Sequence, residues 1–415
     1  MTMTQTSPCC WDSAPAPSLL GFSRPFIAFL GGSLVSRIGD ALYTFALPWM
    51  AYELTHSSLV LGTLYATEIV PVLLFGAFAG VAGVYVDRLN RRHLLLGADL
   101  LRATLVTLIP LLSLLELLQI WELYALAFSL ALLSLASDVA TTAVLPELAQ
   151  SEKTRANAAY QFIMQAAEFA GPALTGLAIA TLGGFHTLWL DALSFGGTFL
   201  VIWRVPNFPG QIRSSLDRHV LSELREGLHW LWKEPVIKML SVQAMLGNLG
   251  LGMVSAVLLY YLRTQLRLPA QLAGLEYAMV GVGGLLGSLL IVPFTRMFRR
   301  GTLYPALLLC GLLGRASMVL LPWWWVPGLS LGIVAACDTA WIILSTSVRQ
   351  ERIPAPLMGR VLSFSRLLST AAMPLGAVIG GLMAQTYDPR LVFCIAALTK
   401  GGEVLIARFS AIHRL

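Results

Sequence analysis

Long apolar runs alternate along this chain with short polar links. Twelve of the runs reach about 20 residues or more, the length that an α-helix needs to cross the hydrocarbon layer of a membrane. The pattern therefore predicts an all-α integral membrane protein with twelve transmembrane helices. In the first half of the chain they lie near Phe26–Tyr52, Leu59–Tyr85, His93–Leu115, Leu123–Leu145, Ala158–Leu182 and Thr187–Val205. In the second half they lie near Val236–Leu262, Gln271–Val292, Thr302–Leu321, Val326–Val348, Gly359–Gln385 and Leu391–Ile412.

Basic residues gather in alternate links between the apolar runs. One set of links contains 17 Lys and Arg residues, three of them in the link at 87–92, whereas the opposite set contains only Arg263, Arg267 and Arg390. In membrane proteins the cytoplasmic loops carry the excess of Lys and Arg. We therefore expect a multi-pass protein of the cytoplasmic (inner) membrane with both termini in the cytoplasm.

The composition favours the same class of protein. Of the 415 residues, 57% are hydrophobic and 12% are charged, whereas soluble domains average about 25% charged residues. Because the net charge of +6 comes from the basic links, we expect it to face anionic membrane lipid and not nucleic acid. The five cysteines lack metal-ligand spacing, and the chain has no nucleophile–base cluster and no phosphate-binding Gly-x-x-x-x-Gly-Lys loop. We expect no cofactor, no metal site, no catalytic residues and no enzymatic activity.

One long polar segment, 206–235, divides the twelve runs into two sets of six. Within it, four leucines between positions 221 and 231 share one helical face, which predicts an amphipathic helix on the inner membrane surface. The two sets echo each other, since Glu68 in the second run corresponds to Glu276 in the eighth. We expect a monomer with a flexible cytoplasmic tail at 1–24 and two six-helix pseudo-repeat bundles at 25–205 and 236–415. A cytoplasmic linker at 206–235 joins the bundles.

The link after the second run matches a family motif. The pattern Gly-x-x-x-Asp-Arg-x-Gly-Arg-Arg is met at Gly83, Asp87, Arg88, Arg91 and Arg92. Asn90 stands in place of its second glycine. With this loop the chain resembles the major facilitator superfamily, and segments 36–40, 145–148 and 224–228 make it similar to the branch of macrolide-efflux proteins and the enterobactin exporter. The resemblance implies two bundles that move a substrate by alternating access.

The fifth run resembles a second motif of that superfamily, the antiporter motif. It is carried by Gly171, Pro172 and Gly176, although Ala167 and Thr175 stand where glycines are typical. The Arg-x-x-Gln-Gly signature of many drug antiporters is absent from the fourth run. The resemblance implies exchange of a substrate against an ion.

The link at 83–92 also predicts a conformational latch. Asp87 precedes the third helix, where a carboxylate can accept free amide hydrogens. We expect the three arginines of the link to pair with acids of neighbouring helices, Asp138 among them, in one conformation and to lose those partners in the other. Such a latch is worth about 1–3 kcal/mol, enough to bias two states. The alternative is that these arginines only set the topology.

Some charges within the predicted spans have a partner one helical turn away. An ionisable residue at bilayer depth costs about 2.5–3.5 kcal/mol on insertion scales. Residues spaced i, i+3 lie one above the other on a helix and can neutralise each other. Three pairs have this spacing: Arg37 with Asp40, Asp99 with Arg102, and Lys400 with Glu403.

Other acids are candidates for proton coupling or for the substrate cavity. Asp40 lies in the first span, which lines the substrate cavity in the superfamily that the chain resembles. Glu68 and Glu168 have no basic neighbour one helical turn away. In the second half, Asp338 is the candidate for the cavity, with Glu276 behind it. Because desolvated carboxyls are suited to binding protons, we expect coupling through these acids. The alternative for each is a structural, hydrogen-bonded acid.

These features predict a secondary active transporter. We expect an exporter that exchanges protons for an amphipathic small molecule such as a drug, macrolide or siderophore. Two alternatives remain open at this point. One is a flippase for lysophospholipid or another lipid, and the other is a membrane sensor or scaffold that binds ligands without moving them.

Overall fold

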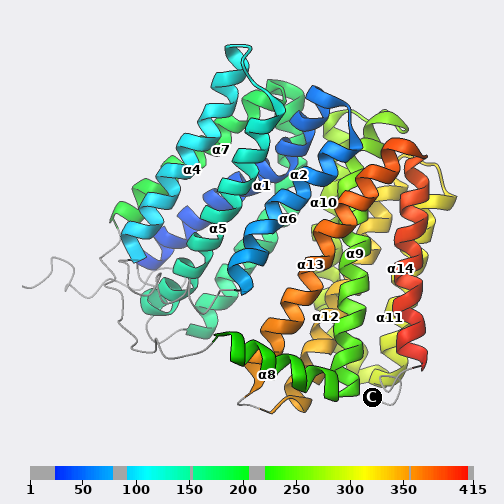
Figure 1. Cartoon of the computed structure of the whole chain (residues 1–415). Helices are drawn as coiled ribbons and strands as arrows, with labels where there is room; N and C mark the ends of the chain where they lie inside the picture. Colours follow the sequence, from blue (N-terminus) through cyan, green and yellow to red (C-terminus); the bar gives the residue numbers. More distant parts are fainter. Residues whose placement is uncertain (1–23, 78–90, 150–152, 205–219, 355–356, 410–415) are drawn as a thin grey trace, which may run out of the picture.

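The computed structural model describes residues 24–77, 91–149, 153–204, 220–354 and 357–409. Thirteen helices and short turns make up these segments (Figure 1). The helices of the first half are α1 (Arg24–Thr55), α2 (Ser58–Ala77), α4 (Arg91–Leu114), α5 (Ile120–Ala149), α6 (Lys153–Leu182) and α7 (Gly184–Arg204). The others are α8 (Val220–Lys233), α9 (Pro235–Thr264), α10 (Ala270–Met297), α11 (Arg300–Leu320), α12 (Val326–Arg352), α13 (Met358–Thr386) and α14 (Pro389–Phe409).

All the long helices of the described segments match predicted spans. Eleven of them are long and apolar enough to cross a membrane. The twelfth, α14, carries Arg390, Lys400, Glu403 and Arg408, which lower its apolarity, yet it packs along α9 and α11 within the molecule. A helix satisfies its own backbone hydrogen bonds, which is why apolar runs adopt this structure in lipid. The predicted all-α integral membrane fold is confirmed.

The helices pack as two bundles (Figure 1). The first consists of α1, α2 and α4–α7, and the second of α9–α14. The short helix α8 lies at one end of the second bundle, against α9 and α13. Its side chains are described from Gly227 onward, where Leu231 is buried and Trp232 is exposed, as the amphipathic pattern predicts.

The two bundles meet through α2 and α6 on one side and α9, α10 and α13 on the other. Close approach depends on glycines. A Cβ atom on Gly62 of α2 would lie 3.3 Å from Gly381 Cα of α13, and one on Gly274 of α10 would lie 3.0 Å from Gly176 Cα of α6. Ser58 Oγ donates a hydrogen bond of 2.9 Å to the carbonyl of Gly381. Backbones that pack this closely leave no room for side chains between the bundles.

These contacts close one end of the molecule, which we call the closed end; it is the end where α1 finishes and α2 begins. Aromatic residues reinforce it, since the rings of Phe45 and Tyr277 lie 5.0 Å apart and the Arg263 guanidinium lies 4.5 Å from the ring centre of Trp49. Among the described residues, α5 makes no comparable contact with α12 or α13. Among the described helices, the extensive contacts between the bundles therefore run from the closed end to mid-helix.

Candidate functional site

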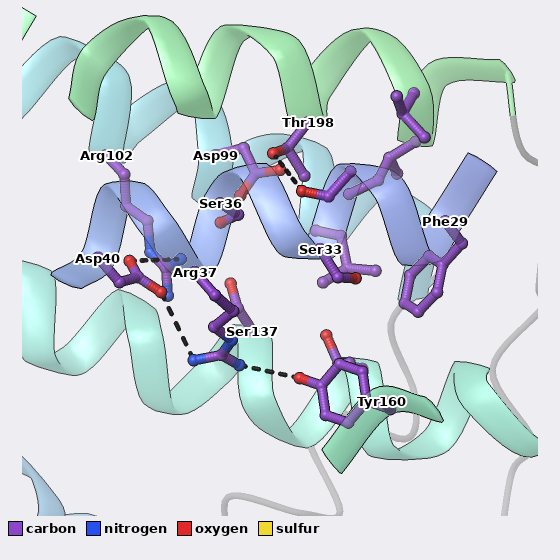
Figure 2. A pocket seen from close by; sticks show the side chains of 15 residues that line it. Phe29, Ser33, Ser36, Arg37, Asp40, Asp99, Arg102, Ser137, Tyr160 and Thr198 are labelled. Atoms are coloured by element: carbon purple, nitrogen blue, oxygen red, sulfur yellow. Dashed lines mark hydrogen bonds and ion pairs between the residues drawn. The ribbon is translucent and has the colours of Figure 1, made fainter. Parts of the chain in front are cut away.

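A charged cluster occupies the centre of the first bundle. Arg37 and Asp40 lie one turn apart on α1, with Arg37 Nη1 3.5 Å from Asp40 Oδ2. Arg37 also pairs with Asp138 of α5 and donates a hydrogen bond of 3.0 Å to the hydroxyl of Tyr160 on α6. From α4, Arg102 Nη1 approaches Asp40 Oδ1 to 4.0 Å. Figure 2 shows Arg37 and Arg102 converging near Asp40.

Two small cavities meet at Arg37 and Asp40, and we call them the first-half cavities. One, of about 40 Å³, is lined by Ser36, Asp99, Arg102 and Thr198 among others (Figure 2). The other, of about 210 Å³, is lined by Tyr43, Glu68, Asp191 and Phe195 among others. Asp40 therefore faces both cavities, and Glu68 shares one of them. The structure brings together two acids that the sequence placed on separate helices.

Asp191 on α7 is a further member of this site, beyond the acids that the sequence pattern singles out. It is fully buried, and Ser194 Oγ lies 3.5 Å from its Oδ1 atom. Within the described segments its Oδ2 atom has no hydrogen-bond partner. Gly39 lets α1 approach this carboxylate, because a Cβ atom there would lie 2.6 Å from Asp191 Oδ1. The signal was present: an acid within a predicted span, with no basic residue one turn away.

Acids outnumber bases in this region. The walls of the first-half cavities, together with Asp138, hold five carboxylates and two guanidinium groups. The guanidinium groups belong to Arg37 and Arg102, so up to three negative charges lack a cation. Uncompensated charge in a low-dielectric site is costly. Such a site can bind protons or a cationic group.

The second bundle contains a larger cavity of about 570 Å³, which we call the second-half cavity; α9, α12, α13 and α14 line it. Lys400 Nζ lies 2.5 Å from Asp338 Oδ1 and 3.0 Å from Glu403 Oε2 in its wall. Gln243 fixes the backbone beside this cluster, since its side-chain amide donates a hydrogen bond of 2.8 Å to the backbone carbonyl of Glu403. Asp338, a predicted cavity residue, does line this cavity.

Two further arginines line the second-half cavity, Arg349 from α12 and Arg366 from α13. Arg349 is half-buried and Arg366 is exposed towards the cavity. Within the described part of the chain, neither guanidinium forms an ion pair. The sequence offered no reason to place these two residues together, because they lie on different helices.

Two of the predicted coupling acids lie elsewhere. Glu276 is buried on α10, and its carboxylate accepts a hydrogen bond from the backbone N–H of Gly328 in the first turn of α12. A carboxylate at a helix N-terminus satisfies a free amide and complements the helix dipole. Glu168 is exposed on α6, outside the walls of the three cavities described above.

Part of the predicted latch lies outside the described residues, namely Gly83, Asp87 and Arg88. Arg91 begins α4, and Arg92 donates a hydrogen bond to the backbone carbonyl of Trp203 on α7. The described partner of Asp138 is Arg37, and not an arginine of the link. The latch therefore stays a prediction.

The antiporter-like segment lies where α6 contacts two neighbours. A Cβ atom on Gly171 would meet the side chain of Ala41 on α1, and one on Gly176 would lie 3.1 Å from Gly274 Cα on α10. The carbonyl of Pro172 faces Gly274 as well. These small residues thus join α6 to its own bundle and to the opposite one.

A comparison with protein families decides the class of this chain. A family profile described as transmembrane secretion effector, within the major facilitator superfamily, matches residues 22–414. The chain belongs to the major facilitator superfamily. Membership of this superfamily makes the chain a multi-pass membrane transporter and not an enzyme, as the sequence predicted.

Curated relatives place the chain near the efflux members of the superfamily. The multidrug efflux pump Tap of Mycobacterium tuberculosis (strain ATCC 25618 / H37Rv) is 30% identical over 408 residues, which cover 94% of this chain and 94% of that protein. Macrolide efflux protein A of Streptococcus pyogenes is 24% identical over 399 residues, or 89% of this chain and 94% of that protein. The predicted resemblance is confirmed.

A solved member of the superfamily has the same fold. A bacterial homologue of the iron transporter ferroportin, in its inward-facing state, matches with a TM-score of 0.72 at 19% identity, over 94% of this chain and 98% of that chain. The same homologue in its outward-facing state matches with a TM-score of 0.56 at 19% identity, over 93% of this chain and 99% of that chain. Both states of that homologue share the fold of this chain.

Proposed function

We propose that this protein is a proton-coupled exporter of an amphipathic small molecule, working by alternating access. The observation that carries the proposal is the surplus of carboxylates around Asp40, where the first-half cavities meet. The similarity to the multidrug efflux pump Tap supports a drug or a similar molecule as the substrate. The excess of basic residues in alternate links supports an orientation in which the termini and the open end face the cytoplasm.

The coupling step follows from charge. Asp40 lies between two guanidinium groups, whereas Glu68 and Asp191 lack an ion pair within the described residues. A proton that binds one of these acids removes surplus negative charge from a low-dielectric site. Release of that proton restores the surplus charge, so the charge of the first bundle differs between the protonated and deprotonated states. One proton moving inward gains about 2.3 kcal/mol per 100 mV of membrane potential.

The two bundles are the moving units in this proposal. In the inward-open state, α2 and α6 of the first bundle pack against α13 and α10 of the second at the closed end. Opening that end separates Gly62 from Gly381 and Gly176 from Gly274. The arginines of the link at 83–92 would then pair with acids at the cytoplasmic end and hold the outward-open state.

Flux in proteoliposomes tests this function. The purified full-length protein is reconstituted, a pH gradient is imposed, and uptake of dyes, macrolides and siderophores is measured. We expect accumulation that an ionophore mixture abolishes by collapsing the pH gradient and the potential. Asp40→Asn and Glu68→Gln should lower gradient-driven accumulation at least tenfold. Glu351→Gln is the matched control, because Glu351 forms an exposed ion pair of 2.8 Å with Arg300 far from these cavities.

The outcomes separate the competing functions. Saturable binding without accumulation would identify a sensor or scaffold. Movement of fluorescent lysophospholipid between leaflets, with no flux of water-soluble substrates, would identify a flippase. Full accumulation by both neutral variants, with unchanged dependence on the pH gradient, would remove the proposed coupling.

A further inference from the structure

The second-half cavity differs in charge from the first-half cavities. Its wall contains two carboxylates, Asp338 and Glu403, and the ammonium of Lys400 bridges both. Two arginines remain, Arg349 and Arg366, and neither has an ion-pair partner among the residues that the structure describes. The wall therefore carries a net positive charge, whereas the first-half cavities carry a net negative one.

The unpaired arginines need a counter-charge in the membrane-embedded state. Arg349 is half-buried, and its Nε atom is enclosed without a hydrogen-bond partner among the described residues. The two negative charges of Asp338 and Glu403 face two other cations, Lys400 and the buried Arg315, so they leave no charge for the arginines of the wall. Guanidinium groups bind carboxylate and phosphate through two parallel hydrogen bonds. An anion bound in the cavity would therefore supply the negative charge that the described residues do not offer to Arg349 and Arg366.

The remaining walls suit an amphipathic molecule. Trp341, Ile342, Leu251 and Leu362 provide apolar surface beside the arginines. A volume of about 570 Å³ lies within the range of about 300–1,000 Å³ that is usual for small-molecule sites. The cavity thus combines a hydrophobic wall with a cationic one.

We propose that the second-half cavity binds the anionic group, a carboxylate or a phosphate, of an amphipathic ligand through Arg349 and Arg366. The inference rests on the proposed export function and names the chemistry of the substrate. It also divides the work between the bundles: the first binds the coupling protons, and the second holds the substrate. The anionic group has two possible sources, a transported small molecule or the head group of a membrane phospholipid.

Binding to the purified full-length protein in maltoside detergent tests the proposal. The probes are dodecanoate, dodecyl phosphate and dodecyltrimethylammonium, which have the same chain and differ in charge. Isothermal titration should give at least tenfold tighter binding for the two anions than for the cation. Arg349→Gln and Arg366→Gln should each weaken anion binding about tenfold or more, as expected for the loss of one hydrogen bond to a charged group.

Matched variants separate binding from folding. Arg352→Gln lies one turn from Arg349 on α12, but Arg352 pairs with Glu234 outside the cavity at 3.3 Å, so anion affinity should not change. Arg366→Lys keeps the charge and should retain more affinity than Arg366→Gln. Thermal unfolding of each variant shows that the protein is folded. Equal binding of anion and cation, or unchanged anion affinity in both folded glutamine variants, would overturn the proposal.

A competition experiment identifies the source of the anion. Dioleoylphosphatidylglycerol is compared with dioleoylphosphatidylcholine as a competitor of dodecyl phosphate in detergent. Displacement by phosphatidylglycerol alone would identify a lipid head group, and displacement by neither would favour a transported molecule. Failure of anion binding with intact gradient-driven export would remove this inference only. Absence of all wild-type export would instead remove the proposed function.

Discussion

Asp138 and Asp338 hold equivalent places in the two bundles. Each lies on the fourth long helix of its half, α5 or α12, and each pairs with a base from another helix of the same bundle. Asp138 pairs with Arg37 on α1, and Asp338 pairs with Lys400 on α14. The bundles thus repeat an interior ion pair while using different helices to supply the base. This supports the pseudo-repeat that the sequence predicted.

Removing Lys400 should destabilise the second bundle. Its side chain and that of Glu403 are each 3% exposed, so Lys400→Met leaves the buried Glu403 carboxylate without its ion-pair partner. Breaking a buried ion pair by removing one partner costs about 3–5 kcal/mol. We expect a large fall in the thermal unfolding temperature of the detergent-solubilised protein. Adding Glu403→Gln to Lys400→Met should restore part of the loss, and a double variant no more stable than the single one would contradict this account.

A larger residue at Gly62 should disturb the closed end. In Gly62→Ala the new methyl group meets the carbonyl of Ala377 on α13, and overpacking of this kind costs about 1–3 kcal/mol. The penalty falls on the inward-open state, so the equilibrium shifts away from it by about fivefold to 150-fold. A cysteine introduced at the buried Ser58, in a background without native cysteines, should react faster with maleimide.

The control for this prediction is Gly31→Ala on α1. Gly31 has no neighbouring atom within 4 Å of the position of a Cβ atom, so labelling of the cysteine should not change. Equal labelling rates in the Gly62→Ala and Gly31→Ala proteins would show that the glycine contact does not hold the bundles together.

Glu276 should act on stability and not on coupling. Glu276→Ala removes the acceptor for the N–H of Gly328 at the start of α12, and loss of such a cap costs about 0.5–2 kcal/mol. We expect a lower unfolding temperature with an unchanged dependence of transport on the pH gradient. A changed dependence in a variant of normal stability would return Glu276 to the coupling acids.

Asp191 should behave as a coupling acid. Asp191→Asn removes one of the surplus charges of the first-half cavities while leaving the shape of the side chain almost unchanged. We expect gradient-driven accumulation to fall at least tenfold, as for Asp40→Asn. Ser194→Ala is the control for local packing, since its hydroxyl lies 3.5 Å from Asp191 Oδ1. Normal gradient-driven accumulation by the Asp191→Asn protein would exclude the residue from coupling.

The candidate acids show which parts of the site can be predicted from the sequence. Asp40, Glu68 and Asp338 were singled out as charges within apolar spans, and all three line cavities. The i, i+3 rule was right for Lys400 with Glu403, at 3.0 Å. It was incomplete for Arg102, which the rule pairs with Asp99. In the described structure Arg102 forms an ion pair with Asp40 on the neighbouring helix α1.

The sequence by itself determined the twelve apolar runs, the side of the membrane expected for each link, and the helix face on which each charge lies. It did so because length, apolarity and periodicity are local properties of the chain. Only the tertiary structure decided that Asp191 joins Asp40, that Glu276 caps α12, and that Arg349 and Arg366 share one cavity. Those relationships depend on which helix faces meet. Helix crossing is set by contacts such as those of Gly39, between residues far apart in the chain, and no local pattern records them.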